Sequence, residues 1–126
     1  MEPTVPNGAF GVGWMGAYWW REPQVGDIVM IRLAGDHVLF LKRVLAQPGD
    51  LVEFRHGELW VNGQPRPEPY VRWKWDWNSA PVRLGPNEYL VMGDRRDMPR
   101  SSHTGGVVQR DRIIGKLLWW FGTAHG

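Results

Sequence analysis

Residues 27–61 read DIVMIRLAGDHVLFLKRVLAQPGDLVEFRHGELWV, and this stretch decides the fold. Residues 27–33 and 37–45 are rich in apolar and β-branched side chains, and the Ala-Gly-Asp between them is a turn signal, so we expect two consecutive strands. In residues 52–61 a His-Gly pair separates residues 52–55 (VEFR) from residues 58–61 (ELWV), which predicts a tight hairpin. The stretch therefore predicts a succession of short strands joined by turns.

Downstream of this stretch the same pattern of strands and turns continues. Asn62-Gly63 marks another turn, and residues 88–92 (EYLVM) predict a strand. A polar loop follows over residues 93–106, and residues 107–121 close the chain with the apolar run IIGKLLWWF. Because no apolar stripe follows the helical period of about 3.6 residues, the predicted fold is mainly β, with antiparallel sheets and long loops.

Tryptophan is unusually frequent: the chain of 126 residues has nine, which is more than a core of this size needs. A Pro- and Trp-rich insertion is expected around residues 64–82, where Trp73, Trp75 and Trp77 alternate with charged residues and would share one face of a strand. Further candidates for exposed indoles are Trp14, Trp19 and Trp20. We expect these indoles either to meet a lipid or peptide surface or to form an aromatic lid over the core.

Length and composition exclude several classes of protein. A chain of 126 residues predicts one domain over residues 1–126 and is too short for a nucleotide-binding domain plus a substrate domain. Cysteine is absent, which excludes disulfide frameworks, zinc knuckles and a thiol nucleophile. The 15 basic and 13 acidic residues are interspersed and give a net charge of +2, so the sequence shows no basic patch that would bind a polyanion.

Residues 1–24 are rich in Gly and Pro and carry few strand or helix signals. Within them residues 11–16 (GVGWMG) match the pattern G-x-G-x-x-G, but no predicted strand precedes the match and the chain has no room for the βαβ unit. We expect a flexible Gly-rich loop there. No apolar run approaches the roughly 18 residues of a membrane span, and no signal peptide is visible, so the chain as written is expected to be soluble.

Lys42 is the first candidate for a catalytic residue. Both faces of its predicted strand are apolar, so the strand should be covered on both sides, with Lys42 on the face of Phe40 and Val44. A lysine among apolar neighbours loses hydration and its pKa falls, and a neutral amine can take a proton from a hydroxyl. On the strand pattern alone, a lysine that reaches solvent or pairs with a carboxylate is the simpler interpretation.

Metal, cofactor and triad chemistry are not indicated by the spacing of residues. The histidines are scattered along the chain at His37, His56, His103 and His125, without a ligand motif. The serines are Ser79, Ser101 and Ser102, and none lies in a G-x-S-x-G elbow. We therefore expect no metal and no cofactor.

Several segments, taken together in order and spacing, resemble the motif boxes of type I signal peptidases. Residues 1–5 (MEPTV) are similar to the S-M-x-P-T-L box without its serine, and residues 26–29 (GDIV) to the G-D-I-V box. Residues 41–44 (LKRV) and 47–50 (QPGD) are similar to the K-R-V-x-G-x-P-G-D box. Residues 92–97 (MGDRRD) and those that follow resemble G-D-N-R-D-N-S-x-D-S-R. Four boxes in order make this a specific match.

Two smaller segments extend the resemblance over nearly the whole chain, because residues 61–63 (VNG) and 113–116 (IIGK) fall where that family has the same letters. The resemblance implies a membrane-anchored Ser–Lys endopeptidase with a mostly β, LexA-related catalytic domain. Such enzymes remove signal peptides from secretory preproteins after small residues, in an Ala-x-Ala context. It implies the plasma (inner) membrane, with the catalytic domain on the outer or periplasmic face.

The resemblance also implies partners and roles for individual residues. The partners would be signal peptides and the membrane surface, with no nucleic acid, while the oligomeric state stays open. Lys42 would be the general base. The substrate would lie as an extended strand beside the residues after Met1, in contact with Met1 and Pro3. The residues expected to support the site structurally are Asp94, Arg96 and Ser102.

The chain departs from the family pattern at two places. The nucleophilic serine should stand immediately before Met1, so the chain as given is expected to be inactive. In the last box the family's first serine aligns with Pro99. The later Asp and the final Arg of that box align with Ser101 and His103, whereas Ser102 matches the second serine of the box. These changes put the hydrogen-bond support of the lysine in question.

Three alternatives remain open from the sequence. A non-catalytic relative would keep the peptide-binding cleft and lack the chemistry, which the missing serine and Pro99 favour and the intact lysine box opposes. A conjugation-pilin maturation peptidase would share the same boxes. A small β-barrel that binds single-stranded nucleic acid would use indoles interleaved with arginines as stacking platforms, but the balanced charge argues against it.

Overall fold

The structure is a computed structural model, and it describes residues 10–14, 22–32, 39–71, 76, 78–94 and 106–121. The strands are β1 (Phe10–Trp14), β2 (Ile28–Arg32), β3 (Leu39–Ala46), β4 (Leu51–Arg55), β5 (Glu58–Val61), β6 (Gln64–Pro65), β7 (Val82–Arg83), β8 (Glu88–Met92), β9 (Val107–Gln109) and β10 (Ile113–Phe121). A 3-10 turn, η2 (Arg110–Arg112), separates β9 from β10. The predicted mainly β fold is therefore confirmed.

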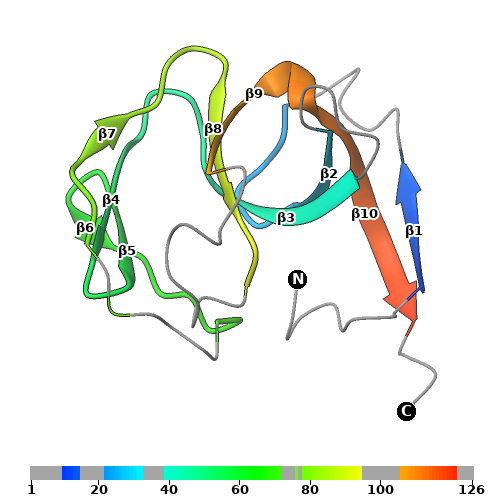
Figure 1. The fold of residues 1–126 in the computed structure, drawn as a ribbon, viewed down its shortest axis with the longest axis horizontal. Coiled ribbons are helices and arrows are strands. Elements are labelled where there is room, and N and C mark those ends of the chain that lie inside the picture. The colour runs from blue at the N-terminus through cyan, green and yellow to red at the C-terminus, as the bar shows by residue number, and fades with distance from the viewer. Residues whose placement is uncertain are drawn as a thin grey trace.

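The strands form two antiparallel sheets. The six-stranded sheet has the order β1-β10-β2-β3-β8-β9, and the four-stranded sheet has the order β6-β5-β4-β7. Figure 1 shows β4 to β7 at one end of the molecule, β1 and β10 at the other, and β3 and β8 between them. Strand β3 leads directly into the four-stranded sheet, so it lies where the two sheets meet.

The predicted hairpin at residues 52–61 is confirmed. Strand β4 pairs with β5 from Val52 opposite Val61 to Arg55 opposite Glu58. The turn residues His56 and Gly57 have positive φ angles of 51° and 77°, which is the backbone that a two-residue hairpin with the right twist requires. Local sequence alone was sufficient to predict this element.

The predicted Gly-rich loop at residues 11–16 is wrong over its first four residues. Residues 10–14 form β1, which pairs with β10 from Phe10 opposite Phe121 to Trp14 opposite Lys116. Strand pairing is made by backbone groups, so a Gly-containing segment of weak propensity can extend a sheet where a long partner strand offers its edge. That partner comes from the other end of the chain, where a local pattern cannot reveal it.

Strands β3 and β8 have a hydrophobic cluster on each face. One, the six-strand cluster, consists of Val29, Ile31, Val44, Tyr89, Val91, Val108 and Ile113. The other, the inter-sheet cluster, consists of Leu45, Ala46, Val52, Phe54, Leu59, Val61, Leu84, Leu90 and Met92. A register shift between Val44 and Ala46 lets the end of β3 turn from one cluster to the other. The expectation that β3 is covered on both sides is confirmed for this part of the strand.

A buried ion pair joins β3 to the segment that follows β8. Arg43 donates from Nε to Oδ1 of Asp94 at 2.9 Å and from Nη2 to Oδ2 at 2.8 Å. The Asp94 side chain is fully buried and that of Arg43 is 12% exposed. Because a buried charge is costly unless it is paired, this two-bond contact fixes the end of β8 against β3.

We expect Leu59→Ala to lower the free energy of unfolding by about 2–5 kcal/mol, because Leu59 is 0% exposed in the inter-sheet cluster and its truncation leaves a cavity. The midpoint and slope of urea unfolding give this value. Val25→Ala is the control, since Val25 is 42% exposed and its truncation should change stability by less than about 0.5 kcal/mol. Equal losses in the two variants would contradict this assignment of the core.

We expect Asp94→Asn to cost about 3–5 kcal/mol of unfolding free energy, because it leaves the Arg43 guanidinium enclosed without its counter-charge. Glu53→Gln is the matched control, since it breaks the Arg55–Glu53 pair, whose arginine side chain is 50% exposed, and should cost at most about 1 kcal/mol. In urea unfolding, the double variant Arg43→Met/Asp94→Leu should lose less unfolding free energy than the sum of the losses in Arg43→Met and Asp94→Leu measured separately. Strict additivity would show that the pair does not act as a unit.

Candidate functional site

Lys42 lies in the middle of β3, on the face that carries the six-strand cluster. It is paired with Val29 of β2, and cross-strand partners project to the same face. Val44, two residues further along β3, is paired with Val91 of β8 and lies on that face too. All three valines are 0% exposed. The stem of Lys42 therefore lies beside fully buried valines, while Lys42 itself is half-buried.

The amine of Lys42 ends beside Gly93, the buried residue that follows β8. A Cβ atom added to Gly93 would lie 3.9 Å from Lys42 Nζ. Glycine thus brings the backbone of the β8 end against the amine with no side chain between them. Gly93 directly precedes Asp94, so the residue that faces Lys42 is bonded to the residue that holds Arg43.

Burial lowers the pKa of Lys42 below the ordinary lysine value of 10.5. The cause is the loss of hydration, which disfavours the charged ammonium. A larger share of this amine is therefore neutral near pH 7 than of an exposed lysine. A neutral amine held in fixed geometry can accept a proton from a nearby hydroxyl, which is the chemistry of a general base.

Arg43 lies on the opposite face of β3 and has a structural role. In addition to Asp94, Arg43 donates from Nη1 to the carbonyl oxygen of Gly26 at 3.2 Å. Its Cζ lies 4.0 Å from the centre of the Tyr70 ring. Burial by itself would lower the pKa of Arg43, but the hydrogen bond and charge of Asp94, with smaller effects of Tyr70 and Glu68, raise it. Arg43 is a permanent cation that anchors rather than reacts.

The structure brings two of the predicted site residues together. Lys42 precedes Arg43, which is paired with Asp94. Asp94 in turn follows Gly93, which lies beside the Lys42 amine. Met1, Pro3, Arg96, Pro99, Ser101, Ser102 and His103 lie outside the described residues, and their roles stay predictions. The same holds for Trp19, Trp20, Trp73, Trp75 and Trp77, and for the side chain of Trp14.

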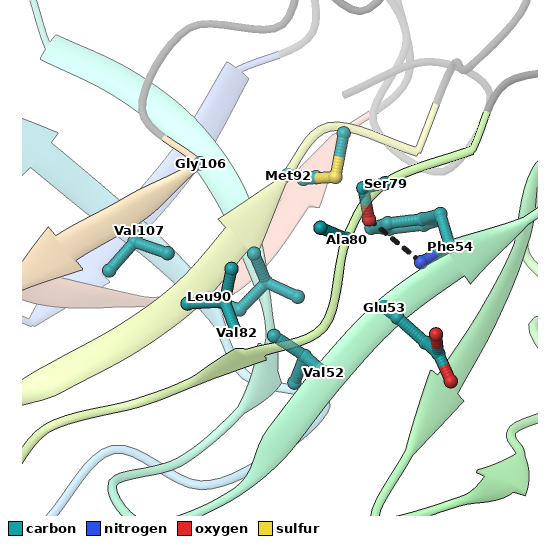
Figure 2. A pocket seen from close by; sticks show the side chains of 10 residues that line it. All are labelled: Val52, Glu53, Phe54, Ser79, Ala80, Val82, Leu90, Met92, Gly106 and Val107. Atoms are coloured by element: carbon teal, nitrogen blue, oxygen red, sulfur yellow. Dashed lines mark hydrogen bonds between the residues drawn. The ribbon is translucent and has the colours of Figure 1, made fainter.

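Ser79, the one serine among the described residues, serves a structural contact. Its Oγ accepts a hydrogen bond from the backbone N–H of Phe54 at 2.9 Å, and its own N–H donates to the Phe54 carbonyl at 3.0 Å. Ser79 also lines an apolar pocket of about 100 Å³. Figure 2 shows it there together with Leu90 and Met92. These two residues alternate with Val91, so the pocket lies on the face of β8 opposite the Lys42 side.

Two residues near the site were missed from the sequence, namely Tyr70 and Glu68. Both belong to the Pro-rich stretch that was predicted only as part of an insertion. The contact of the Tyr70 ring with Arg43 joins residues 27 positions apart, a separation that no local pattern reports. The only available signal was an aromatic residue and a carboxylate in an otherwise Pro-rich stretch. Within the described residues, no three His, Asp or Glu side chains are grouped so that they could hold a metal ion.

Comparison with known proteins gives one consistent result. The family described as "Signal peptidase, peptidase S26" matches residues 1–121. The chain is 34% identical over 129 residues to the probable signal peptidase I-1 of Synechocystis sp., covering 96% of the chain and 66% of that protein. It is 31% identical over 124 residues to the probable signal peptidase I-2 of the same organism, covering 94% and 57%. The chain thus spans less than two thirds of the length of these relatives.

A solved structure agrees with the sequence relatives. The crystal structure of a signal peptidase I from Enterococcus faecalis V583 superposes with a TM-score of 0.60 at 26% identity, covering 77% of this chain and 97% of that one. Among the described residues there is no helix long and apolar enough to cross a membrane. The family match over residues 1–121 and the shared fold lead to one conclusion: the chain belongs to the signal peptidase family, peptidase S26.

Proposed function

We propose that this chain is the catalytic domain of a serine endopeptidase that removes signal peptides from secretory preproteins after small residues, in an Ala-x-Ala context. The observation that carries the proposal is the amine of Lys42, which is set among fully buried valines and has a lowered pKa. Family membership supplies the reaction class, a serine protease hydrolase. Lys42 is the general base of a Ser–Lys dyad.

The proposed mechanism has two stages. Neutral Lys42 takes the proton of the serine hydroxyl, the alkoxide attacks the scissile carbonyl, and the lysine then gives the proton to the leaving amine. Water, activated by the same amine, then hydrolyses the acyl-enzyme. The proposed nucleophile is the serine that the family resemblance places immediately ahead of Met1.

The substrate and the membrane are proposed partners. An extended peptide beside the residues after Met1 would add a strand to the molecule, with Met1 and Pro3 in contact with its small side chains. Indoles at the headgroup level would hold the domain at the outer or periplasmic face of the plasma membrane. This arrangement would present Lys42 to a bond close to the bilayer surface.

We expect cleavage by only one of three proteins tested on a synthetic Ala-x-Ala signal peptide. The first is residues 1–126, the second carries a serine and a few residues of a relative ahead of Met1, and the third adds Lys42→Ala to that extension. Only the second should cut, because it alone has both members of the dyad, and losing a general base costs about 10²–10⁴-fold in rate. Mass spectrometry of the products locates the cleaved bond.

A result in which the third protein cuts as fast as the second would overturn the role of Lys42. If none of the three cuts but the peptide binds to all of them, the non-catalytic relative is the better description. Cleavage of a pilin precursor in place of the signal peptide would identify the conjugation-pilin peptidase.

We expect the rate of the serine-extended protein to depend on pH through Lys42. Only the neutral amine is a base, so kcat/KM should rise about tenfold per pH unit below the pKa of Lys42 and level off above it. Because burial lowers that pKa, the plateau should begin below 10.5. A rate that keeps rising to pH 10.5 would show that Lys42 is hydrated like an exposed lysine.

A further inference from the structure

The segment that contains Glu68 and Tyr70 packs against Arg43. The Tyr70 ring lies 4.0 Å from the Arg43 Cζ, a cation–π contact. The Tyr70 hydroxyl donates to Oε2 of Glu68 at 3.0 Å. The Glu68 residue is itself buried, at 6% exposed. A chain of polar contacts therefore runs from Glu68 through Tyr70 and Arg43 to Asp94.

The same segment is tied to β3 and to the four-stranded sheet at a second point. Arg66 donates from Nη1 to the carbonyl oxygen of Leu45 at 2.7 Å, two residues beyond Arg43. Its backbone N–H donates to the carbonyl of Leu59 at 2.9 Å. The backbone N–H of Val71 closes a turn on the carbonyl of Glu68 at 3.0 Å. Tyr70 is thus presented to Arg43 from a turn whose N-terminal side is tied to the rest of the molecule by Arg66.

These contacts lead to the environment of Lys42. Arg43 follows Lys42 on β3, and Asp94 follows Gly93, the residue whose backbone faces the Lys42 amine. Arg43 and Asp94 therefore connect the Tyr70 contact to the backbone beside the Lys42 amine. A shift of Arg43 would carry Asp94 and Gly93 with it and would give water access to the amine.

We infer that Tyr70, held by Glu68, is a positioning residue for Lys42: its ring keeps Arg43 on Asp94, and so keeps the Gly93 backbone closed over the amine. The ring also shields the guanidinium from water, which strengthens the ion pair that it covers. The catalytic consequence of this contact rests on the function proposed above. The effect on the protonation of Lys42 does not, and it can be measured without any cleavage.

The experiment is competitive labelling of the lysines with trace acetic anhydride between pH 6 and 11, with peptide mass spectrometry as the readout. Only a neutral amine reacts, so the labelling midpoint of Lys42 reports its pKa. Tyr70→Leu should move this midpoint toward 10.5 by about one pH unit. Lys116, whose Nζ lies 3.4 Å from Asp27, is labelled in the same samples and serves as the internal reference.

Matched variants separate positioning from general loosening. Trp60→Leu removes the ring that lies 4.1 Å from the exposed Arg55 and should leave the Lys42 midpoint unchanged. Glu68→Gln keeps an oxygen that can accept the Tyr70 hydroxyl and should retain the wild-type midpoint. Glu68→Ala removes this hydrogen bond but keeps the ring, so it should give a smaller shift than Tyr70→Leu. Tyr70→Phe keeps the ring and should give a smaller shift than Tyr70→Leu. These milder changes keep the test decisive if Tyr70→Leu does not fold.

In the serine-extended protein, Tyr70→Leu should lower kcat/KM about tenfold at pH 7 and leave the high-pH plateau within about twofold, because only the protonation of Lys42 changes. An equal loss at every pH would indicate general damage and would overturn the inference. An unchanged Lys42 midpoint in Tyr70→Leu, or an equal shift in Trp60→Leu, would overturn it as well. If the wild-type extended protein does not cut, the proposed function fails while the labelling still decides the role of Tyr70.

Discussion

Strand β3 carries two adjacent cations and has a hydrophobic cluster on each face, and this constraint shapes the rest of the site. Alternation sends Lys42 toward the six-strand cluster and Arg43 toward the other face. Each cation must lose water, which is costly unless it is paired or discharged. Arg43 keeps its charge and is paired with a fully buried carboxylate. Lys42 can lose its proton instead, so its pKa falls.

The different chemistries of Arg and Lys explain why this order of residues suits the site. A guanidinium stays charged and offers a planar fork of donors, which Asp94 and the Gly26 carbonyl occupy and the Tyr70 ring covers. An ammonium on a flexible stem changes protonation readily when it is buried. On one face of β3, Arg43 therefore fixes the neighbouring segments in place, and on the other face Lys42 can act as a base. The peptide from Gly93 to Asp94 joins the two faces.

The parts of the fold that follow from neighbouring residues could be predicted. The His56-Gly57 hairpin and strands β2, β3 and β8 came from alternation, apolar runs and turn residues, all of which act within a few positions. Strand β1 was missed because its partner is β10 at the far end of the chain. The two-residue strands β6 and β7 depend on pairing with β5 and β4 and carry no pattern of their own. At the site, Lys42 and Asp94 could be named, whereas Tyr70 and Glu68 could not.

The sequence by itself determined the mainly β architecture, the presence of a lysine in a strand with two apolar faces, and the resemblance to signal peptidases. These depend on residue type and short spacings, which a linear pattern records. The tertiary structure alone decided that Gly93 lies beside the Lys42 amine and that Arg43 contacts both Asp94 and Tyr70. Hydration, and with it the pKa of a lysine, depends on atoms brought together from distant parts of the chain, so only the folded arrangement determines how readily Lys42 gives up its proton.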